Sequence, residues 1–180
     1  MSPPHAAGSP VVLLPDAGPL ITLAYADALD LLFKPGWPVH MVDMVLHEVT
    51  RNATPTSEKI GRWVSAHQLP VMETRTFQHY RKEQAQGGME KARKANLGEL
   101  AIQEAMHELA LAEPETTGVF LFEDHKIARA SFLVPDNCHK ISTRAWLQFL
   151  EGKGWIASAG AIESAAIANG RLFSSLRFPP

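Results

Sequence analysis

Four acidic side chains occupy positions where the sequence could place a site for a divalent cation. Asp16 and Asp124 each come shortly after an apolar run that suits a buried strand, and Glu48 and Glu99 lie in segments with helical periodicity. Clustered carboxylates repel one another unless a hard divalent cation neutralises them. Donor sets made only of oxygen select Mg²⁺ or Mn²⁺ over Zn²⁺. Such a cation can activate water and polarise a phosphoryl oxygen, so these residues are predicted to be catalytic metal ligands for a displacement at phosphorus.

Each of these acids also has a purely structural interpretation. Asp16 and Asp124 suit helix N-caps, Glu48 could be a surface acid, and the Asn-x-x-Glu spacing that ends at Glu99 resembles a capping box. The position of Glu99 favours a site, because at about 100° per residue it projects within about 20° of Met106 and off the centre of the polar helix face. The order and placement of all four acids, rather than any one of them, support the metal site.

The elements that must position these acids alternate between strands and helices. This alternation predicts an α/β fold, a three-layer sandwich with helices around a central, mostly parallel sheet. In such a sheet ligands bind beyond the carboxyl ends of the strands, where Asp16 and Asp124 are expected. The expected strands cover residues 11–14, 39–42, 71–72, 118–122 and 139–142, and the expected helices cover residues 20–33, 44–51, 54–64, 96–111, 124–130, 143–151 and 158–169. The last two helices form a C-terminal pair.

The composition is that of one globular domain. The 180 residues, 46% hydrophobic and 20% charged, allow one sizeable core, and the net charge of −2 argues against a wholly basic nucleic-acid coat. A single cysteine, Cys138, excludes an internal disulfide and fits the reducing cytoplasm. Residues 1–9 are expected to be a disordered tail. No apolar run approaches the roughly 18 residues of a membrane helix, and the spacing of the histidines predicts no zinc site.

A local basic segment offers a route to nucleic acid. Residues 75–94 hold six basic side chains against two acidic ones, a net charge of +4, and three of the basic ones are Lys91, Arg93 and Lys94. The segment could follow a phosphate backbone, with Phe77 or Tyr80 available for base stacking. A solvated helix or loop is the structural alternative, and it remains open. Further candidate phosphate contacts at the expected rim of the site are Arg129, Arg144 and Thr143.

The segments that carry the four acids resemble the PIN-domain family, in particular its compact prokaryotic branch of VapC-like toxin ribonucleases. The resemblance covers residues 10–145. It rests on VVLLPDAGPLI at residues 11–21, VDMVLHEV at 42–49, LGELAI at 97–102 and VFLFEDHKIAR at 119–129. Each motif alone is weak, but all four occur in the order and on the elements that the family has.

The resemblance implies a metal-dependent endoribonuclease, with Asp16, Glu48, Glu99 and Asp124 as ligands of Mg²⁺ or Mn²⁺. It also implies the toxin half of a toxin–antitoxin pair, an RNA substrate, a homodimer and an antitoxin partner. Residues 10–145 would form the catalytic domain, and residues 146–180 a C-terminal helical extension packed on it. The sequence Glu123-Asp124-His125 departs from the Asp-Asp pair of close relatives. Because neighbouring strand residues point to opposite faces, we assign the ligand to Asp124 and leave open whether Glu123 assists.

Two other classes of protein remain as alternatives. A phosphotransfer or receiver-like module would carry an Asp-x-Asp pair, but Asp16 is followed by Ala17 and Gly18. A PIN-like protein that has lost catalysis and binds RNA or protein is the stronger alternative. The presence of all four acids argues against it.

Overall fold

The computed structural model of the 180-residue chain describes residues 10–87, 97–123 and 133–172. The expected tail at residues 1–9 and the helical turn expected at 124–130 lie outside these ranges. So do five of the candidate site residues, which are Asp124, Lys91, Arg93, Lys94 and Arg129.

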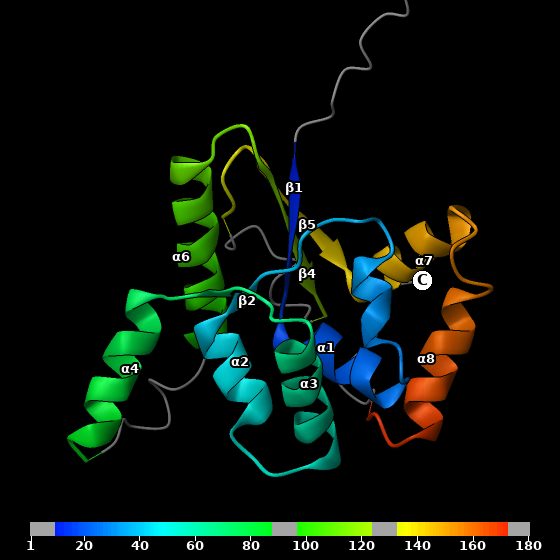
Figure 1. Cartoon of the computed structure of the whole chain (residues 1–180), viewed down its shortest axis with the longest axis horizontal. Coiled ribbons are helices and arrows are strands. Elements are labelled where there is room, and N and C mark those ends of the chain that lie inside the picture. Colours follow the sequence, from blue (N-terminus) through cyan, green and yellow to red (C-terminus); the bar gives the residue numbers. More distant parts are fainter. Residues whose placement is uncertain (1–9, 88–96, 124–132, 173–180) are drawn as a thin grey trace, which may run out of the picture.

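A parallel sheet forms the centre of the molecule (Figure 1). Strands β1 (Val11–Pro15), β4 (Thr117–Phe122) and β5 (Cys138–Ser142) pair in the order β1-β4-β5. Both pairings are parallel, with Leu14 opposite Phe120 and Leu121 opposite Ile141. A second parallel pair, β2 (Met41–Val42) and β3 (Val71–Met72), connects to β1 through an isolated bridge between Leu13 and Val39. The predicted α/β class with a mostly parallel sheet is confirmed.

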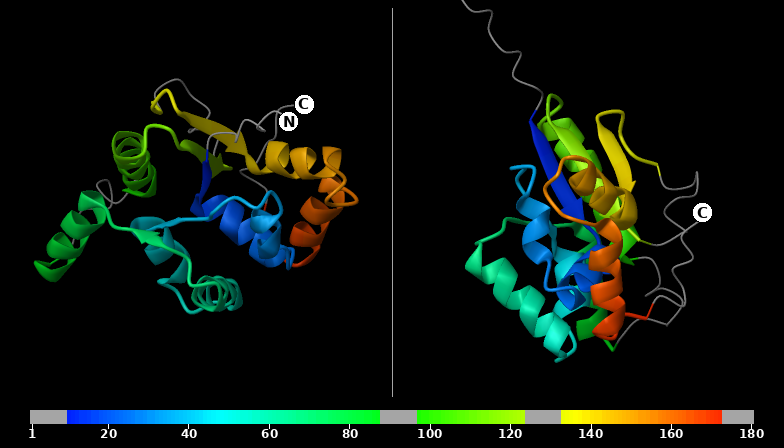
Figure 2. Two further views of the ribbon diagram at one scale, coloured as in Figure 1. Left: turned by 45° about the horizontal axis from the view of Figure 1, so that its top comes forward. Right: turned by 90° about the vertical axis from the view of Figure 1, so that its right-hand side faces the viewer.

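Helices lie on both sides of this sheet (Figure 2). The middle strand, β4, shows the consequence most directly: consecutive residues Phe120 and Leu121 point to opposite faces, and both are fully buried. A strand buried on both faces needs apolar side chains at nearly every position, which explains the continuous apolar run of β4. The helices described are α1 (Ala17–Tyr25), α2 (Asp43–Thr50), α3 (Pro55–Ala66), α4 (Arg75–Ala85), α6 (Leu97–Ala112), α7 (Thr143–Gly152) and α8 (Ala159–Ala168), with one 3₁₀ helix, η1 (Leu29–Phe33).

The helix expected at residues 20–33 is broken in two, so that prediction was wrong. Helix α1 ends at Tyr25, and Asp27 takes a left-handed backbone conformation with φ of 55° before η1 begins. Aspartate tolerates this conformation better than most residues, because its short side chain bonds locally. The buried residues Ala24, Ala28 and Leu32 keep a helical spacing of four residues across the break. Apolar periodicity therefore could not reveal it.

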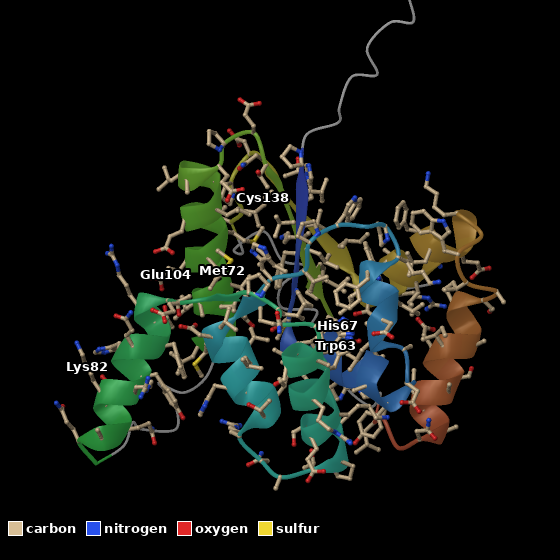
Figure 3. All side chains as sticks on the ribbon, viewed as in Figure 1. Trp63, His67, Met72, Lys82, Glu104 and Cys138 are labelled. Carbon is tan, nitrogen blue, oxygen red and sulfur yellow. The ribbon has the colours of Figure 1, made fainter. Side chains whose placement is uncertain are left out.

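Helix α4 was not predicted, because its sequence is strongly polar and only Tyr80 is buried. Its first turn is held instead by side chains that accept its free N–H groups. The hydroxyl of Thr74 accepts from Phe77 N, and Glu104 of α6 accepts from Arg75 N at 2.7 Å and Thr76 N at 3.0 Å. In Figure 3, Glu104 lies between α6 and the start of α4, and Lys82 lies on the outward side of α4.

Asp43, the first residue of α2, holds the chain directly before α4 in place. Its carboxylate is buried and accepts from Thr74 N at 2.7 Å, Thr74 Oγ1 at 2.8 Å and Met44 N at 2.7 Å. Three donors satisfy the buried charge, so Asp43 has a structural role.

In the ranges that the structure describes, no helix is both long enough and apolar enough to span a membrane.

Candidate metal centre

Asp16 stands at the carboxyl end of β1, where the strand passes into α1. Its N–H donates to the carbonyl of Leu121 in β4 at 2.9 Å, which continues the pairing of the two strands. Its carboxylate is the N-cap of α1 and accepts from Ala17 N at 2.8 Å. The predicted cap is therefore present, and the half-buried carboxylate sits at the positive end of the helix dipole. Strand pairing and capping together fix its position at the edge of the sheet.

Glu48 is held between two helices. It is half-buried on α2 and lies against the second residue of α6, Gly98. A Cβ atom added to Gly98 would be 2.8 Å from Glu48 Oε2, so only glycine leaves room for this carboxylate. Burial raises the pKa of Glu48. Arg51 lowers this pKa and Glu99 raises it, each by less than burial does.

Glu99 lies in the first turn of α6 and is half-buried. Its negative charge raises the pKa of Glu48, as the smallest of three influences on that pKa, which places the two carboxylates near each other. Helices α2 and α6 pack directly against one another. The structure therefore brings two of the four predicted ligands, Glu48 and Glu99, together on neighbouring helices.

The full cluster is not brought together within the described ranges. In residues 10–87, 97–123 and 133–172, no group of three or more His, Cys, Asp or Glu side chains is arranged to hold a metal ion. The fourth predicted ligand, Asp124, lies outside them. Figure 1 shows the starts of α1 and α6, together with α2, near the carboxyl end of β1. The four-acid metal site thus stays a prediction, with the Glu48–Glu99 pair as its described part.

Glu123, which directly precedes Asp124, takes a position that the sequence did not reveal. Its side chain is only 3% exposed and forms an ion pair with Arg171 at 3.0 Å. It lies against the first turn of α1, since a Cβ atom on Gly18 would be 2.9 Å from Glu123 Cβ. The glycine two residues after Asp16 was the available signal for a close approach. The partner, Arg171, is too distant in the sequence for any local pattern to identify it.

Two of the predicted RNA contacts, Arg144 and Thr143, lie in the described ranges, and they differ in their exposure to solvent. Arg144 is exposed at the start of α7, with its Nε 3.8 Å from Glu163 Oε1 of α8. Thr143 is buried, and its hydroxyl donates to the carbonyl of Phe122 at 3.4 Å. Thr143 therefore joins α7 to β4 and does not present its hydroxyl to a ligand.

The predicted stacking residues form an aromatic cluster between α2 and α4. Tyr80 is buried, stacks on Phe77 and has its hydroxyl 3.3 Å from His47 Nε2. Burial and, to a lesser extent, Arg51 lower the pKa of His47, which favours the neutral ring in this contact. Tyr80 thus anchors α4 beside Glu48 and is not available for base stacking.

Comparison with solved structures identifies the fold. The PIN domain of T. brucei RRP44 aligns over 82% of this chain and 83% of its own, with a TM-score of 0.50 and 15% sequence identity. The chain has a PIN-like fold. No family model matches the sequence, and no curated protein sequence matches it significantly. At this sequence identity the similarity concerns the fold alone, so the chemistry must be inferred from the side chains of this chain.

The raised pKa of Glu48, caused mainly by burial and to a smaller extent by Glu99, predicts a characteristic pH dependence of stability. The folded protein binds a proton at Glu48 more readily than the unfolded chain does, because its pKa is raised above the ordinary 4.5. This contribution to stability is fully present below pH 4.5 and is lost as the pH rises through the raised pKa. Glu48→Gln should therefore gain stability relative to the wild type as the pH rises from 4 to 7.

Urea unfolding in EDTA at several pH values measures this difference. Glu108→Gln, on the exposed face of α6, is the matched control and should show no such trend. A stability difference between Glu48→Gln and the wild type that is the same at every pH would contradict the raised pKa of Glu48.

Proposed function

We propose that this protein is a metal-dependent endoribonuclease of PIN type, which hydrolyses phosphodiester bonds in RNA. The observation that carries the proposal is the half-buried pair Glu48 and Glu99, with Glu48 raised in pKa. The helices that carry the pair, α2 and the start of α6, lie near the carboxyl end of β1, which Asp16 directly follows (Figure 1). Ligand sites in open α/β sheets form at that edge.

The pair is unfavourable in the protein alone, which supports a role beyond folding. Burial of Glu48 and its repulsion by Glu99 both disfavour the charged carboxylate, and Arg51 offsets this only in part, so a proton or a cation would stabilise the pair further. Their oxygen atoms match the preference of Mg²⁺ and Mn²⁺. The donor set therefore fits a divalent cation, with Asp16, Glu48, Glu99 and Asp124 as the proposed ligands.

Each proposed ligand has a role in the reaction. A bound Mg²⁺ or Mn²⁺ would supply an activated water and polarise the phosphoryl oxygen. Asp16, which directly follows β1, and Asp124, which comes two residues after β4 in the sequence, are the proposed central ligands. Glu48 and Glu99 are outer ligands or orient water. The raised pKa of Glu48 makes its carboxylate a stronger proton acceptor than an ordinary glutamate.

RNA would reach this site along basic side chains. We propose Lys91, Arg93, Lys94, Arg129 and Arg144 as phosphate contacts. Helix α4 supports the same route, because its exposed basic residues Arg75, Arg81 and Lys82 outnumber its one acid, Glu83. Such contacts would bind the phosphate backbone without reading its sequence.

The wider biological role is part of the proposal. We infer that the protein acts in the cytoplasm as the toxin of a toxin–antitoxin pair, as a homodimer held inactive by an antitoxin. A small gene next to its own, whose product forms a complex with this chain and suppresses its RNA cleavage, would support this. An isolated gene and a harmless, fully active protein in the cell would contradict it.

A PIN-fold module that binds RNA or protein without cleaving it is the alternative function. It is favoured by one observation, the lack of a three-ligand metal group in residues 10–87, 97–123 and 133–172. Melting curves with Mg²⁺ separate the two functions. A ligand that binds only the folded state raises its stability by about 1.4 kcal/mol at tenfold excess over Kd. The non-catalytic module would show no such increase.

Removing either central ligand should abolish cleavage while preserving the fold. In Asp16→Asn the amide oxygen can still cap α1, so the change removes the charge and keeps the N-cap. We expect Asp16→Asn and Asp124→Asn each to lower RNA cleavage by roughly 10²-fold or more, since metal activation of water is worth several kcal/mol. Circular dichroism should stay native. Wild-type rates in both variants with added Mg²⁺ would show that the assignment is wrong.

Gly98→Ala tests the site without removing an acid. The new Cβ would displace the Glu48 carboxylate, whose Oε2 lies 2.8 Å from its position. Alanine also favours a helix over glycine by about 1 kcal/mol, so the fold should not be destabilised. We expect cleavage to fall at least tenfold, the equivalent of about 1.4 kcal/mol in the barrier, with an unchanged or higher melting temperature.

Gly61→Ala in α3 is the matched control, because its Cβ would meet only Thr50 Cγ2 at 3.9 Å. This variant should keep wild-type activity. If Gly98→Ala cleaves RNA as fast as Gly61→Ala does, Glu48 does not take part in the reaction.

Neutralising the basic segment should weaken RNA binding and reduce its dependence on salt. For the triple variant of Lys91, Arg93 and Lys94 to Gln, the slope of log K against log salt should flatten by about 0.7 for each lost single-strand contact. Cleavage at saturating RNA should barely change. A double variant of the exposed residues Lys34 and Arg62 serves as the control. An unchanged slope in the triple variant would assign phosphate binding to Arg129 and Arg144 instead.

A further inference from the structure

The chain turns back toward the sheet directly after the last helix, α8. Gly170 takes a left-handed conformation with φ of 106°, and its N–H donates to Ile167 O while the next N–H, of Arg171, donates to Ala166 O. This pattern is a helix C-terminal motif that glycine permits at little strain. The turn directs the side chain of Arg171 back to the core of the PIN-like fold.

Arg171 then joins two elements that are far apart in the sequence. Its Nε donates to Thr22 Oγ1 of α1 at 3.0 Å, and its Nη2 lies 3.0 Å from Glu123 Oε2 at the end of β4. The side chain of Arg171 is 20% exposed and that of Glu123 is 3% exposed. Thr22 is also buried. Charge-assisted hydrogen bonds of this kind are among the strong ones in proteins, and the planar guanidinium fixes their direction.

Glu123 connects Arg171 to the start of α1, where Asp16 of the candidate metal centre lies. Its side chain packs on Gly18 in the first turn of α1, two residues after Asp16. The N–H of Asp16 bonds to Leu121, two residues before Glu123. The end of β4 and the start of α1 are thus tied together at Leu121 and at Glu123, and Asp124 is the next residue in the sequence.

Stability alone is a weak reason for such an ion pair. A buried pair of charges often contributes no more than apolar side chains of similar volume would, because of the desolvation penalty. Within the described part of the chain, Glu123 Oε1 also has no hydrogen-bond partner, which adds to the penalty. Unlike an apolar contact, the ion pair fixes the orientation of the end of β4 relative to α1.

We propose that Arg171 is a positioning residue for the candidate metal centre. By holding Glu123, it sets the end of β4 against the first turn of α1 and so fixes the placement of Asp16 relative to the carboxyl end of β4. The C-terminal helices, which carry no recognisable motif, thereby act on the site. The part of this proposal that concerns metal rests on the proposed function, whereas the hold on Asp16 does not.

The test compares Arg171→Met and Arg171→Lys with Asn169→Ala. Asn169 belongs to the same turn and also ties α8 to α1, but its Nδ2 donates to Tyr25 O at the far end of that helix, 2.7 Å away. Asn169→Ala therefore controls for loosening of α8 without affecting Glu123. Arg171→Lys retains the charge but cannot reach both partners, so it should restore part of each effect.

The first measurement is hydrogen exchange at the Asp16 amide, with the Leu13 amide as an internal reference on the same strand, bonded to Pro38 O. In Arg171→Met the Asp16 amide should exchange about tenfold faster relative to Leu13, and in Asn169→Ala it should not change. Equal changes at both amides, or no change at Asp16, would overturn the proposed hold.

The second measurement is the Mg²⁺ concentration that gives half of the thermal stabilisation. It should rise at least about fivefold in Arg171→Met and stay constant in Asn169→Ala, because a looser site binds its cation more weakly. If Asp16 loosens and this concentration does not change, Arg171 is a structural contact only. If the wild type shows no response to Mg²⁺, the proposed function fails, and the exchange data still decide whether Arg171 holds Asp16.

Discussion

The burial of two neighbouring carboxylates, Glu48 and Glu99, is the constraint on which the account of this molecule depends. Two carboxylates on neighbouring helices are each half-buried, and one of them has a raised pKa. Such a contact must be held in place by the surrounding structure, because it gains nothing from the two groups themselves. Gly98 is part of that support, since it lets Glu48 approach the start of α6.

The sheet provides the rest of the support. Because β1 and β4 run parallel, their carboxyl ends meet at one edge, and the bond from Asp16 N to Leu121 O fixes the first acid there. The complete burial of Phe120 and Leu121 on opposite faces keeps β4 rigid between two helical layers. Arg171 adds a tie from the C-terminal turn to the same edge. A preorganised set of carboxylates is what metal-assisted hydrolysis requires of a protein.

Much of the fold could be predicted from the sequence, because local signals and the fold agree there. The Thr54 cap with Pro55 after it begins α3, the apolar run of β4 is a strand, and Asp16 is an N-cap. What could not be predicted depends on contacts between distant residues. Helix α4 needs Glu104 from α6 to satisfy its first turn. The burial of Thr143 depends on the packing of α7 against β4.

The candidate site could likewise be predicted only in part from the sequence. The residue types and their order predicted which acids to consider, and the structure brings Glu48 and Glu99 together. Their mutual distance follows from how α2 packs on α6, which no local pattern encodes. The same is true of the pair between Glu123 and Arg171, whose members are separated by 48 residues. Sequence patterns identify candidate chemistry, whereas tertiary packing decides which groups meet.

A crystal structure of the protein grown with millimolar Mn²⁺ tests the central claim most directly. Anomalous scattering locates the metal without any knowledge of the RNA target. The account predicts a peak about 2.1 Å from a carboxylate oxygen of Asp16, the coordination distance of such small cations, with Glu48 or Glu99 as a further ligand or bonded to a metal-bound water. A structure in which Mn²⁺ binds elsewhere, or in which these carboxylates contact only protein and water, would contradict it.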